Sequence, residues 1–249
     1  MTLSTSRPLA LVTGASSGIG KAIAHLFAKN QFTVLGATRS GIYQFSCDVH
    51  DQIQGALVID IPFDLSDLNS IKVTVGYIKD HYGRIDCLVN SAGVAHGSLI
   101  QMTRLEDLRR CMDINFVGQI CIIQESIRLL RKSENPCIVN ISSISAFRSD
   151  PGSIAYGASK AALNFATSVL STELQRFHIR VNAIAPGITE TPMLTQMSES
   201  SVRTQIDSAD IKRVATPLQI AEVALFLSTK SSSHITGQII KVDGGQLCR

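Results

Sequence analysis

The sequence predicts an α/β fold in which a doubly wound, seven-stranded parallel sheet carries helices on both faces. Three observations indicate this: short runs rich in Val, Ile and Leu recur, helical patterns lie between most of them, and the 249 residues are 45% hydrophobic and 17% charged. Near-continuous apolar runs suit strands that are buried on both faces by crossover helices. The predicted strands are Leu9–Val12, Phe32–Leu35, Ala56–Ile59, Ile85–Val89, Cys137–Ile141, Ile179–Ile184 and Gln238–Val242.

The first strand leads into the turn TGASSGIG and then into KAIAHLFAKN, which has the period of a helix. Gly14, Gly18 and Gly20 follow a G-x-x-x-G-x-G spacing there, so the backbone can approach a pyrophosphate at the positive end of the helix. A plain tight turn is the alternative. This strand–turn–helix unit predicts a dinucleotide site and a Rossmann-type sheet.

The segment between the second and third strands is irregular. From Arg39 to Phe63 the chain has Gly41 and scattered Asp and Gln residues, which leave little room for a full-length crossover helix. We expect a short or irregular element there. No repeat or linker divides the rest of the chain, so residues 1–249 are expected to form one domain.

The stretch SIAYGASKAALNF places Tyr156 and Lys160 four residues apart among small and apolar residues. On a helix the two side chains point the same way, and an ammonium can lower the pKa of a phenol, so that Tyr156 could exchange a proton with a substrate oxygen. An ordinary amphipathic helix whose Lys reaches water gives the same pattern. The pair alone leaves both interpretations open.

Charge and cysteine content exclude several classes of protein. The net charge of +3 is small and its Lys and Arg residues are scattered, so we expect no nucleic-acid partner. The six cysteines have no CxxC or Cys/His ligand spacing, which argues against a metal site. The N-terminal apolar stretch is too short for a signal peptide, and no run of about 18 apolar residues occurs, so a cytoplasmic protein without membrane contact is expected.

Further motifs lie in order along nearly the whole chain. They are TGASSGIG (13–20), NSAG (90–93), DIN (113–115), NISSIS (140–145), YGASK (156–160), APGITET (185–191) and ITGQIIKVDGG (235–245). In order and spacing they resemble the short-chain dehydrogenase/reductase family, and most of all its 3-oxoacyl-acyl-carrier-protein reductase branch. The resemblance implies hydride transfer between nicotinamide and a substrate carbonyl or secondary alcohol.

The resemblance implies a catalytic tetrad of Asn115, Ser143, Tyr156 and Lys160. Ser143, at the family's spacing before Tyr156, would hold the substrate carbonyl; its neighbour Ser142 is the alternative. Tyr156 would protonate the carbonyl oxygen, while Lys160 would lower the pKa of Tyr156 and bind the nicotinamide ribose. Asn115 would anchor a water in the proton path, or would be an ordinary hydrogen-bonding residue inside a helix.

The end of the second strand indicates the coenzyme. Family members that choose NAD have an acid where this chain has Thr38, and Arg39 follows, whose guanidinium can pair with a 2′-phosphate. NADP(H) is therefore favoured over NAD(H), although a surface Arg at a strand end is common. Asp64 would contact the adenine, or would instead cap the helix that starts near Leu68. The similar CDVHD at 47–51 lies too far before NSAG.

Two loops complete the expected cofactor site. Asn90 and Gly93 would line the ribose side, and Ile188 and Thr191 would hold the carboxamide. The expected cofactor residues are Gly14, Ser16, Ser17, Gly18, Ile19, Gly20, Arg39, Asp64, Leu65, Asn90, Ala92, Gly93, Tyr156, Lys160, Pro186, Gly187, Ile188 and Thr191.

The expected function is that of an NADP(H)-dependent reductase similar to the acyl-carrier branch, with acyl carrier protein as a partner. The carrier-binding positions of that branch fall on Glu134 and Phe177, with Lys132 and Arg176 only nearby, which weakens this assignment. A reductase of a free steroid, polyol, sugar or secondary metabolite is the alternative. A non-catalytic nucleotide-binding regulator on the same fold is a further one.

The segment at about 190–214 predicts a substrate lid, because it mixes a few apolar residues with many Ser, Thr and charged ones. Met193, Leu194 and Met197 would meet the substrate together with Ser143 and Tyr156. A helix pair that only fills an edge of the fold is the alternative.

The helices expected around INFVGQICIIQESIRLL and ALNFATSVLSTEL are apolar on more of their surface than one sheet face can cover. Family members pair these two helices across a two-fold axis. The resemblance therefore implies a homotetramer.

Overall fold

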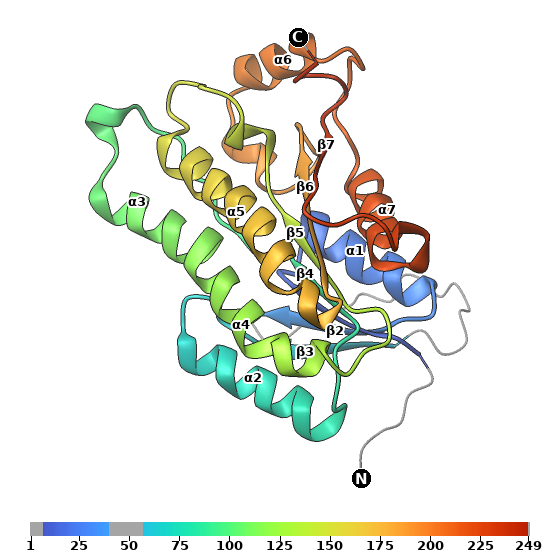
Figure 1. Ribbon diagram of the computed structural model, residues 1–249. Coiled ribbons are helices and arrows are strands. Elements are labelled where there is room, and N and C mark those ends of the chain that lie inside the picture. The colour runs from blue at the N-terminus through green and yellow to red at the C-terminus, as the bar shows by residue number, and fades with distance from the viewer. Residues whose placement is uncertain (1–6, 40–56, 249) are drawn as a thin grey trace.

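The computed structural model describes residues 7–39 and 57–248, and its centre is one parallel sheet (Figure 1). The spatial order of the strands is β3-β2-β1-β4-β5-β6-β7. The predicted doubly wound, seven-stranded parallel sheet is confirmed, with strand ends that differ from the expected ones by up to three residues. The strands are β1 (Leu9–Thr13), β2 (Thr33–Thr38), β3 (Leu57–Pro62), β4 (Cys87–Asn90), β5 (Cys137–Ile141), β6 (Arg180–Pro186) and β7 (Ile239–Val242).

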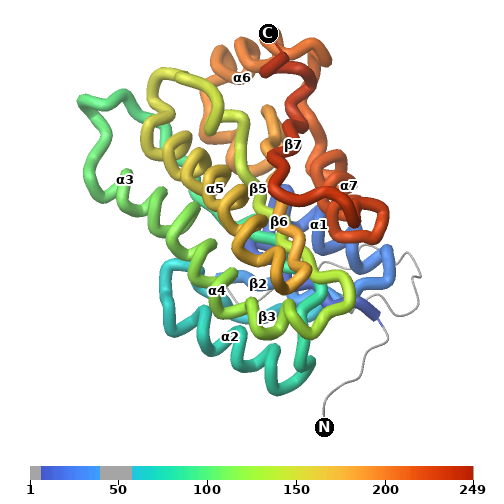
Figure 2. Tube along the Cα trace, in the orientation of Figure 1, coloured from blue at the N-terminus to red at the C-terminus, as the bar shows by residue number. Residues whose placement is uncertain are grey.

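Helices cover both faces of the sheet (Figure 1). On one face α1 (Gly18–Lys29) packs against α7 (Pro217–Ser228), and on the other face lie α2 (Leu68–His81), α4 (Gly118–Leu130) and α5 (Ile154–Glu173). The helix α3 (Leu105–Met112) packs on α5 and runs into α4 through a π-helical turn, Asp113–Val117. The helix α6 (Glu199–Ser208) lies at the same end of the molecule as the C-terminus (Figure 2). Short 3₁₀ turns occupy Ile100–Met102, Ile144–Ala146, Gln175–Phe177, Leu194–Gln196 and Lys230–Ser232.

The alternation of side chains along β1 explains why the sheet is covered on both faces. Leu9 and Leu11 join the core beneath α2, α4 and α5, whereas Ala10 and Val12 join the core beneath α1 and α7. All five residues of β1 are buried. A strand with two apolar faces is stable only between two helical layers.

The strand order reverses at β1, and this reversal determines where a ligand can bind. β1 pairs with β2 on one side and with β4 on the other, so the loops that follow β1 and β4 diverge. In open parallel sheets the crevice at such a switch point, beyond the carboxyl ends of the strands, is the usual binding site.

The opposite edge of the sheet is tied together by one carboxylate. Asp86, just before β4, accepts hydrogen bonds from the backbone N–H of Leu9 at 2.6 Å, from Arg84 Nε at 3.0 Å and from Ser133 Oγ at 2.6 Å. These bonds connect the starts of β1 and β4 with the loop before β5. They fix the amino edge of the sheet independently of the binding crevice.

Two parts of the chain differ from the sequence expectations or lie outside the described residues. The irregular element expected between Arg39 and Phe63 falls mostly on residues 40–56, which lie outside the described residues, and its last part forms β3. The π-helical turn at Asp113–Val117 was not expected. In the described ranges, no helix is long and apolar enough to cross a membrane.

Candidate active site

A cavity of about 630 Å³ opens at the carboxyl edge of the sheet, at the reversal beside β1. It is lined by residues from loops that follow six of the strands and from α3, α5 and α6. The predicted site residues that line it are Gly14, Ser16, Ser17, Gly18, Ile19, Gly20, Arg39, Asp64, Leu65, Ala92, Gly93, Ser143, Tyr156, Lys160, Pro186, Gly187, Ile188, Thr191, Met193, Leu194 and Met197.

The glycine turn has the geometry of a phosphate cradle. Gly14 and Gly18 have positive φ angles of 67° and 51°. A Cβ at Gly20 would collide with the carbonyl oxygen of Gly14, so the turn closes only with glycine there. Ser17 caps α1 without a side-chain hydrogen bond, and no acidic residue lies in the first turn. The first backbone N–H groups of α1 thus have no side-chain acceptor, which fits the pyrophosphate of a dinucleotide.

The hydroxyl of Thr13 holds the two loops of the switch point together. It accepts hydrogen bonds from the backbone N–H groups of Ser91 and Ala92 at 3.0 and 3.1 Å. A Cβ at Gly14 would lie 2.7 Å from the Cα of Ala92, so the loops are in close contact. The two loops at the floor of the cavity are therefore joined directly to each other.

Arg39 and Asp64 lie at the end of the cavity beyond β2 and β3. The hydroxyl of Thr38 donates to Asp60 Oδ1 at 2.9 Å, and the exposed Arg39 follows it. Asp64 Oδ1 accepts from the backbone N–H and the hydroxyl of Ser66 at 2.9 and 2.7 Å. These two hydrogen bonds, more than the nearby Arg39, lower the pKa of Asp64.

The alternative role of Asp64 as a helix cap is wrong. The side chain that caps α2 is Asp67, which accepts from the backbone N–H of Asn69 at 2.9 Å. Asp64 instead folds the loop before that helix, because its own N–H donates to Ser70 Oγ at 2.9 Å.

Ser143, Tyr156 and Lys160 meet at the other end of the cavity. Ser143 follows β5 and its Oγ accepts from the backbone N–H of Ser145 at 3.1 Å. Ser142 turns the other way, since its hydroxyl donates to the backbone carbonyl of Lys160 at 3.4 Å. Tyr156 and Lys160 lie one turn apart on α5, and the backbone of this helix comes close to Ser145 at Gly157, where a Cβ would be 2.8 Å from the Ser145 carbonyl oxygen.

Burial changes the proton affinity of both helix residues. Removal from water lowers the pKa of Lys160 to about 8. It also raises the pKa of Tyr156, and a hydrogen bond with Ser143 opposes this rise. Burial is the largest influence on both groups, because it disfavours charge on either of them, and the Lys160 ammonium donates to the Ile141 carbonyl at 2.9 Å. The expectation that Lys160 favours the ionised form of Tyr156 stays a prediction.

Two predicted residues, Asn90 and Asn115, do not line the cavity. The side chain of Asn90 is 0% exposed and donates to Asn140 Oδ1 at 2.9 Å, so its expected place on the ribose side is wrong. Asn140 in turn donates to Thr167 Oγ1 at 2.9 Å, which links the sheet to α5. Asn90 is thus part of the support beneath the cavity.

Asn115 is also fully buried, in the π-helical turn. Its Oδ1 accepts from the backbone N–H of Val94 at 2.8 Å, and its Nδ2 donates to the Val94 carbonyl at 2.9 Å and to Ser159 Oγ at 3.0 Å. Both Nδ2 hydrogens are used, so Asn115 could hold a water only as an acceptor, through the second lone pair of Oδ1 or through its backbone carbonyl. The side chain joins the loop after β4 to α5.

The cavity has further lining residues that were not predicted. Val94 and Ala95 directly follow the NSAG motif, and the helical period places Arg110 one turn before Ile114 of the DIN motif, so both pairs could have been found from the motifs. Gln205, from α6, had no such signal. The unpredicted lining residues include Val94, Ala95, Arg110, Ile114 and Gln205.

Comparison with known proteins identifies the family to which this chain belongs. The profile of the family described as Enoyl-(Acyl carrier protein) reductase matches residues 14–246. The chain is similar to a 3-oxoacyl-(acyl-carrier-protein) reductase of Thermotoga maritima, with 36% identity over 94% of this chain and 96% of the relative. It is also similar to a 3alpha-hydroxysteroid dehydrogenase of Mediterraneibacter gnavus, with 30% identity over 95% of each chain.

Solved structures agree with the sequence comparison. A short chain dehydrogenase/reductase family protein superposes with a TM-score of 0.85 at 30% identity, covering 97% of this chain and 98% of the other. YwfH, an NADPH dependent reductase involved in bacilysin biosynthesis, superposes with a TM-score of 0.90 at 27% identity, covering 98% and 100%. The chain therefore belongs to the short-chain dehydrogenase/reductase family of oxidoreductases, which bind a nicotinamide cofactor.

Proposed function

We propose that this protein is an NADP(H)-dependent reductase of a 3-oxoacyl group, in the cytoplasm, with acyl carrier protein as the carrier of that group. The observation that carries the proposal is the layout of one cavity. Ser143, Tyr156 and Lys160 lie at one end, and the glycine turn leads to Arg39 at the other. A dinucleotide laid along this cavity would bring its nicotinamide to the Ser143 end.

The protein residues would supply orientation and the proton. The bound nicotinamide supplies the hydride for the carbonyl carbon. The Ser143 hydroxyl donates a hydrogen bond to the carbonyl oxygen and holds it beside Tyr156. The Tyr156 hydroxyl then gives its proton to that oxygen, and the tyrosinate left behind is stabilised by the Lys160 ammonium. The buried position of Lys160 strengthens this interaction, because little water screens the two charges.

Arg39 supports the preference for NADP(H). It is exposed, lines the cavity and follows Thr38, whose hydroxyl is bonded to Asp60. No carboxylate precedes it at the end of β2, so a 2′-phosphate there would meet a guanidinium without competition from an acid at that position. The structurally similar YwfH is described as NADPH dependent.

Two guanidinium groups support a carrier partner, even though Glu134 and Phe177 occupy the positions that bind the carrier in the similar family branch. Arg131 and Arg176 lie against the ring of Phe177, with Cζ atoms 4.3 and 4.6 Å from its centroid. This places positive charge at the base of α4 and α5, where an acidic helix of a carrier could pair with it. The relative from Thermotoga maritima is named for a carrier-bound substrate.

A reductase of a free apolar ketone is the second candidate. Met193, Leu194 and Met197 line the substrate end, and such side chains suit a ring as well as an acyl chain. One relative is named a 3alpha-hydroxysteroid dehydrogenase. Both candidates use the same proton donor and differ only in the group beyond the carbonyl.

A substrate panel with active-site variants tests the proposal. NADPH oxidation is followed with acetoacetyl-acyl carrier protein, acetoacetyl N-acetylcysteamine and ketosteroids. The proposal expects the highest kcat/KM for the carrier-bound thioester, and a fall of about tenfold with Arg176→Glu for that substrate alone. Tyr156→Phe should lower kcat by roughly 100-fold or more for every substrate, whereas the control Tyr82→Phe should not. A higher kcat/KM with ketosteroids would favour the second candidate.

A further inference from the structure

Arg110 lines the cavity, yet neither the catalytic end nor the phosphate sites use it. Its side chain is exposed, and its guanidinium makes no hydrogen bond or ion pair within residues 7–39 and 57–248. The other cationic side chains that line the described cavity are Arg39 and Lys160, which already have proposed roles. Asp107, on the same helix, attracts Arg110 through space but is paired with Arg104, so Arg110 is a cation on the wall of a ligand site that makes no hydrogen bond among the described residues.

The helical period shows which end of the cavity Arg110 faces. Arg110 and Ile114 lie one turn apart, both line the cavity, and Ile114 packs against the apolar core that contains Leu65. One further turn along, Gly118 touches the same residue, because a Cβ there would lie 2.8 Å from Leu65 Cγ. The face of α3 that carries Arg110 thus continues into the face that meets Leu65 at Gly118.

Leu65 and Ile114 would form the two apolar walls of a slot at this end of the cavity. A flat aromatic ring fits between such walls, and the adenine of the proposed dinucleotide is the ring available there. A guanidinium above the slot can lie over a π system and can donate hydrogen bonds to ring nitrogens. An adenine offers both a π face and ring nitrogens that accept hydrogen bonds, and it carries no charge.

We propose that Arg110 covers the adenine of the cofactor, opposite Leu65, and adds to dinucleotide affinity whether or not a 2′-phosphate is present. This inference rests on the proposed use of a nicotinamide dinucleotide. Arg110 differs in this role from Arg39, because Arg39 would act on the 2′-phosphate alone.

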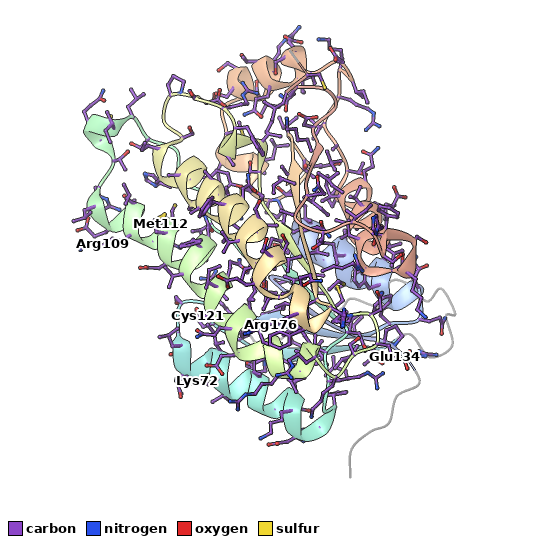
Figure 3. All side chains as sticks on the ribbon, in the orientation of Figure 1. Lys72, Arg109, Met112, Cys121, Glu134 and Arg176 are labelled. Carbon is purple, nitrogen blue, oxygen red and sulfur yellow. The ribbon has the colours of Figure 1, made fainter. Side chains whose placement is uncertain are left out.

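Binding measurements on single variants test the role of Arg110 without turnover. The variants are Arg110→Gln, Arg110→Lys and the matched control Arg109→Gln; Arg109 is the exposed neighbour that Figure 3 shows on α3 at the outer edge of the molecule. The probes are NADPH, NADH, adenosine 5′-monophosphate and reduced nicotinamide mononucleotide. Dissociation constants come from the fluorescence of the reduced nicotinamide and, for the adenosine fragment, from competition with NADH.

The expected result separates the two ends of the cofactor. Arg110→Gln should raise the dissociation constants of NADPH, NADH and the adenosine fragment by about 5- to 20-fold and leave that of the nicotinamide fragment unchanged. Arg110→Lys should retain part of the affinity, and Arg109→Gln should match the wild type.

Other results would overturn the inference. A loss for NADPH alone would assign Arg110 to the 2′-phosphate. Unchanged dinucleotide binding with a raised KM for the ketone would assign it to the substrate, for example to an anionic group. A wild-type protein that binds NADPH but reduces no ketone would refute the proposed reaction and leave this test intact, whereas one that binds no dinucleotide would refute both.

Discussion

Lys160 Nζ lies 5.9 Å from the centre of the Tyr156 ring, one turn along the same helix. The ammonium donates its hydrogen bond to the Ile141 carbonyl, and burial lowers its pKa to about 8. The positive charge beside the proton donor is therefore present at neutral pH and lost in mildly alkaline solution.

The rate of carbonyl reduction should follow this ionisation. Tyr156 stays protonated across this range because burial raises its pKa, so the proton donor itself remains. Above about pH 8, neutral Lys160 no longer stabilises the tyrosinate, and kcat should fall as pH rises. Initial rates with saturating NADPH and ketone from pH 6 to 10 measure this. A profile that stays flat through pH 9 would contradict it.

The same burial should make Lys160 costly for stability. Its folded pKa of about 8 lies below the ordinary value of 10.5, so between these values the unfolded chain binds more protons and the contribution of Lys160 to the free energy of unfolding rises with pH. Below pH 8 this difference between the folded pKa and the ordinary pKa of Lys160 corresponds to roughly 3 kcal/mol of destabilisation of the folded protein. Lys160→Met should thus raise the free energy of unfolding, measured by urea denaturation, at pH 7, and should raise it by a smaller amount at pH 10. The exposed Lys72→Met is the control, and a destabilised Lys160→Met protein at pH 7 would refute this.

Arg39→Ala should separate the two coenzymes. Loss of a charged hydrogen bond to the 2′-phosphate should weaken NADPH binding by about 1.5–3 kcal/mol and change NADH binding little. Fluorescence titration with both coenzymes measures the effect, with Lys29→Ala, at the far end of α1, as a control. Equal losses for NADPH and NADH would show that Arg39 does not contact the phosphate.

The proposed lid at 190–214 should move mainly in its first part. Its later part is held, because Gln246 Nε2 donates to the Gln205 carbonyl at 2.6 Å and to Ser208 Oγ at 2.9 Å. The backbone N–H groups of Asp210 and Ile211 also donate to the Gly244 carbonyl. Hydrogen exchange should therefore slow across 190–204 when NADPH and substrate bind, while 205–211 stays protected throughout.

The Gln246→Ala variant provides the control for the lid. It should speed exchange at 205–208 in the absence of ligand and raise KM more than it lowers kcat. Equal protection of 190–204 with and without ligands would show that this segment is not a lid.

The exposed apolar face of α4 and α5 predicts assembly. Phe165 is 74% exposed at the centre of α5, and Val169 on the same helix and Val117, in the π-helical turn just before α4, are also exposed. Such a surface is stable in water when a second copy covers it, in line with the proposed homotetramer. Phe165→Asp should dissociate the assembly in light scattering, whereas Val73→Asp, at a 63% exposed position on α2, should not. A wild-type monomer at micromolar concentration would refute the assembly.

The strands and the glycine turn could be predicted because their signals are local. Each strand is an apolar run, and Gly14, Gly18 and Gly20 are needed for the turn itself. The motifs then indicated most of the cavity lining. The resemblance also indicated Ser143 over Ser142, and the structure shows these two side chains turned in different directions.

The misplaced residues depend on contacts that no local pattern shows. Asn90 faces inward because the parallel register sets it beside Asn140, fifty residues away in the chain. The π-helical turn accompanies the hydrogen bonds of Asn115 to Val94, and the low pKa of Lys160 comes from burial by the completed fold. Each effect exists only after the layers have packed together.

The bonds of Asp86 have a consequence for how this scaffold can change. Asp86, Leu9 and Ser133 fix the amino edge of the sheet and share no residue with the cavity lining at the other edge. The bonds that fix this edge are thus separate from the segment 190–204, which lies at the other edge. A lineage, or an engineer, can exchange that segment for one of another shape and alter the substrate range while the bonds of Asp86 are kept.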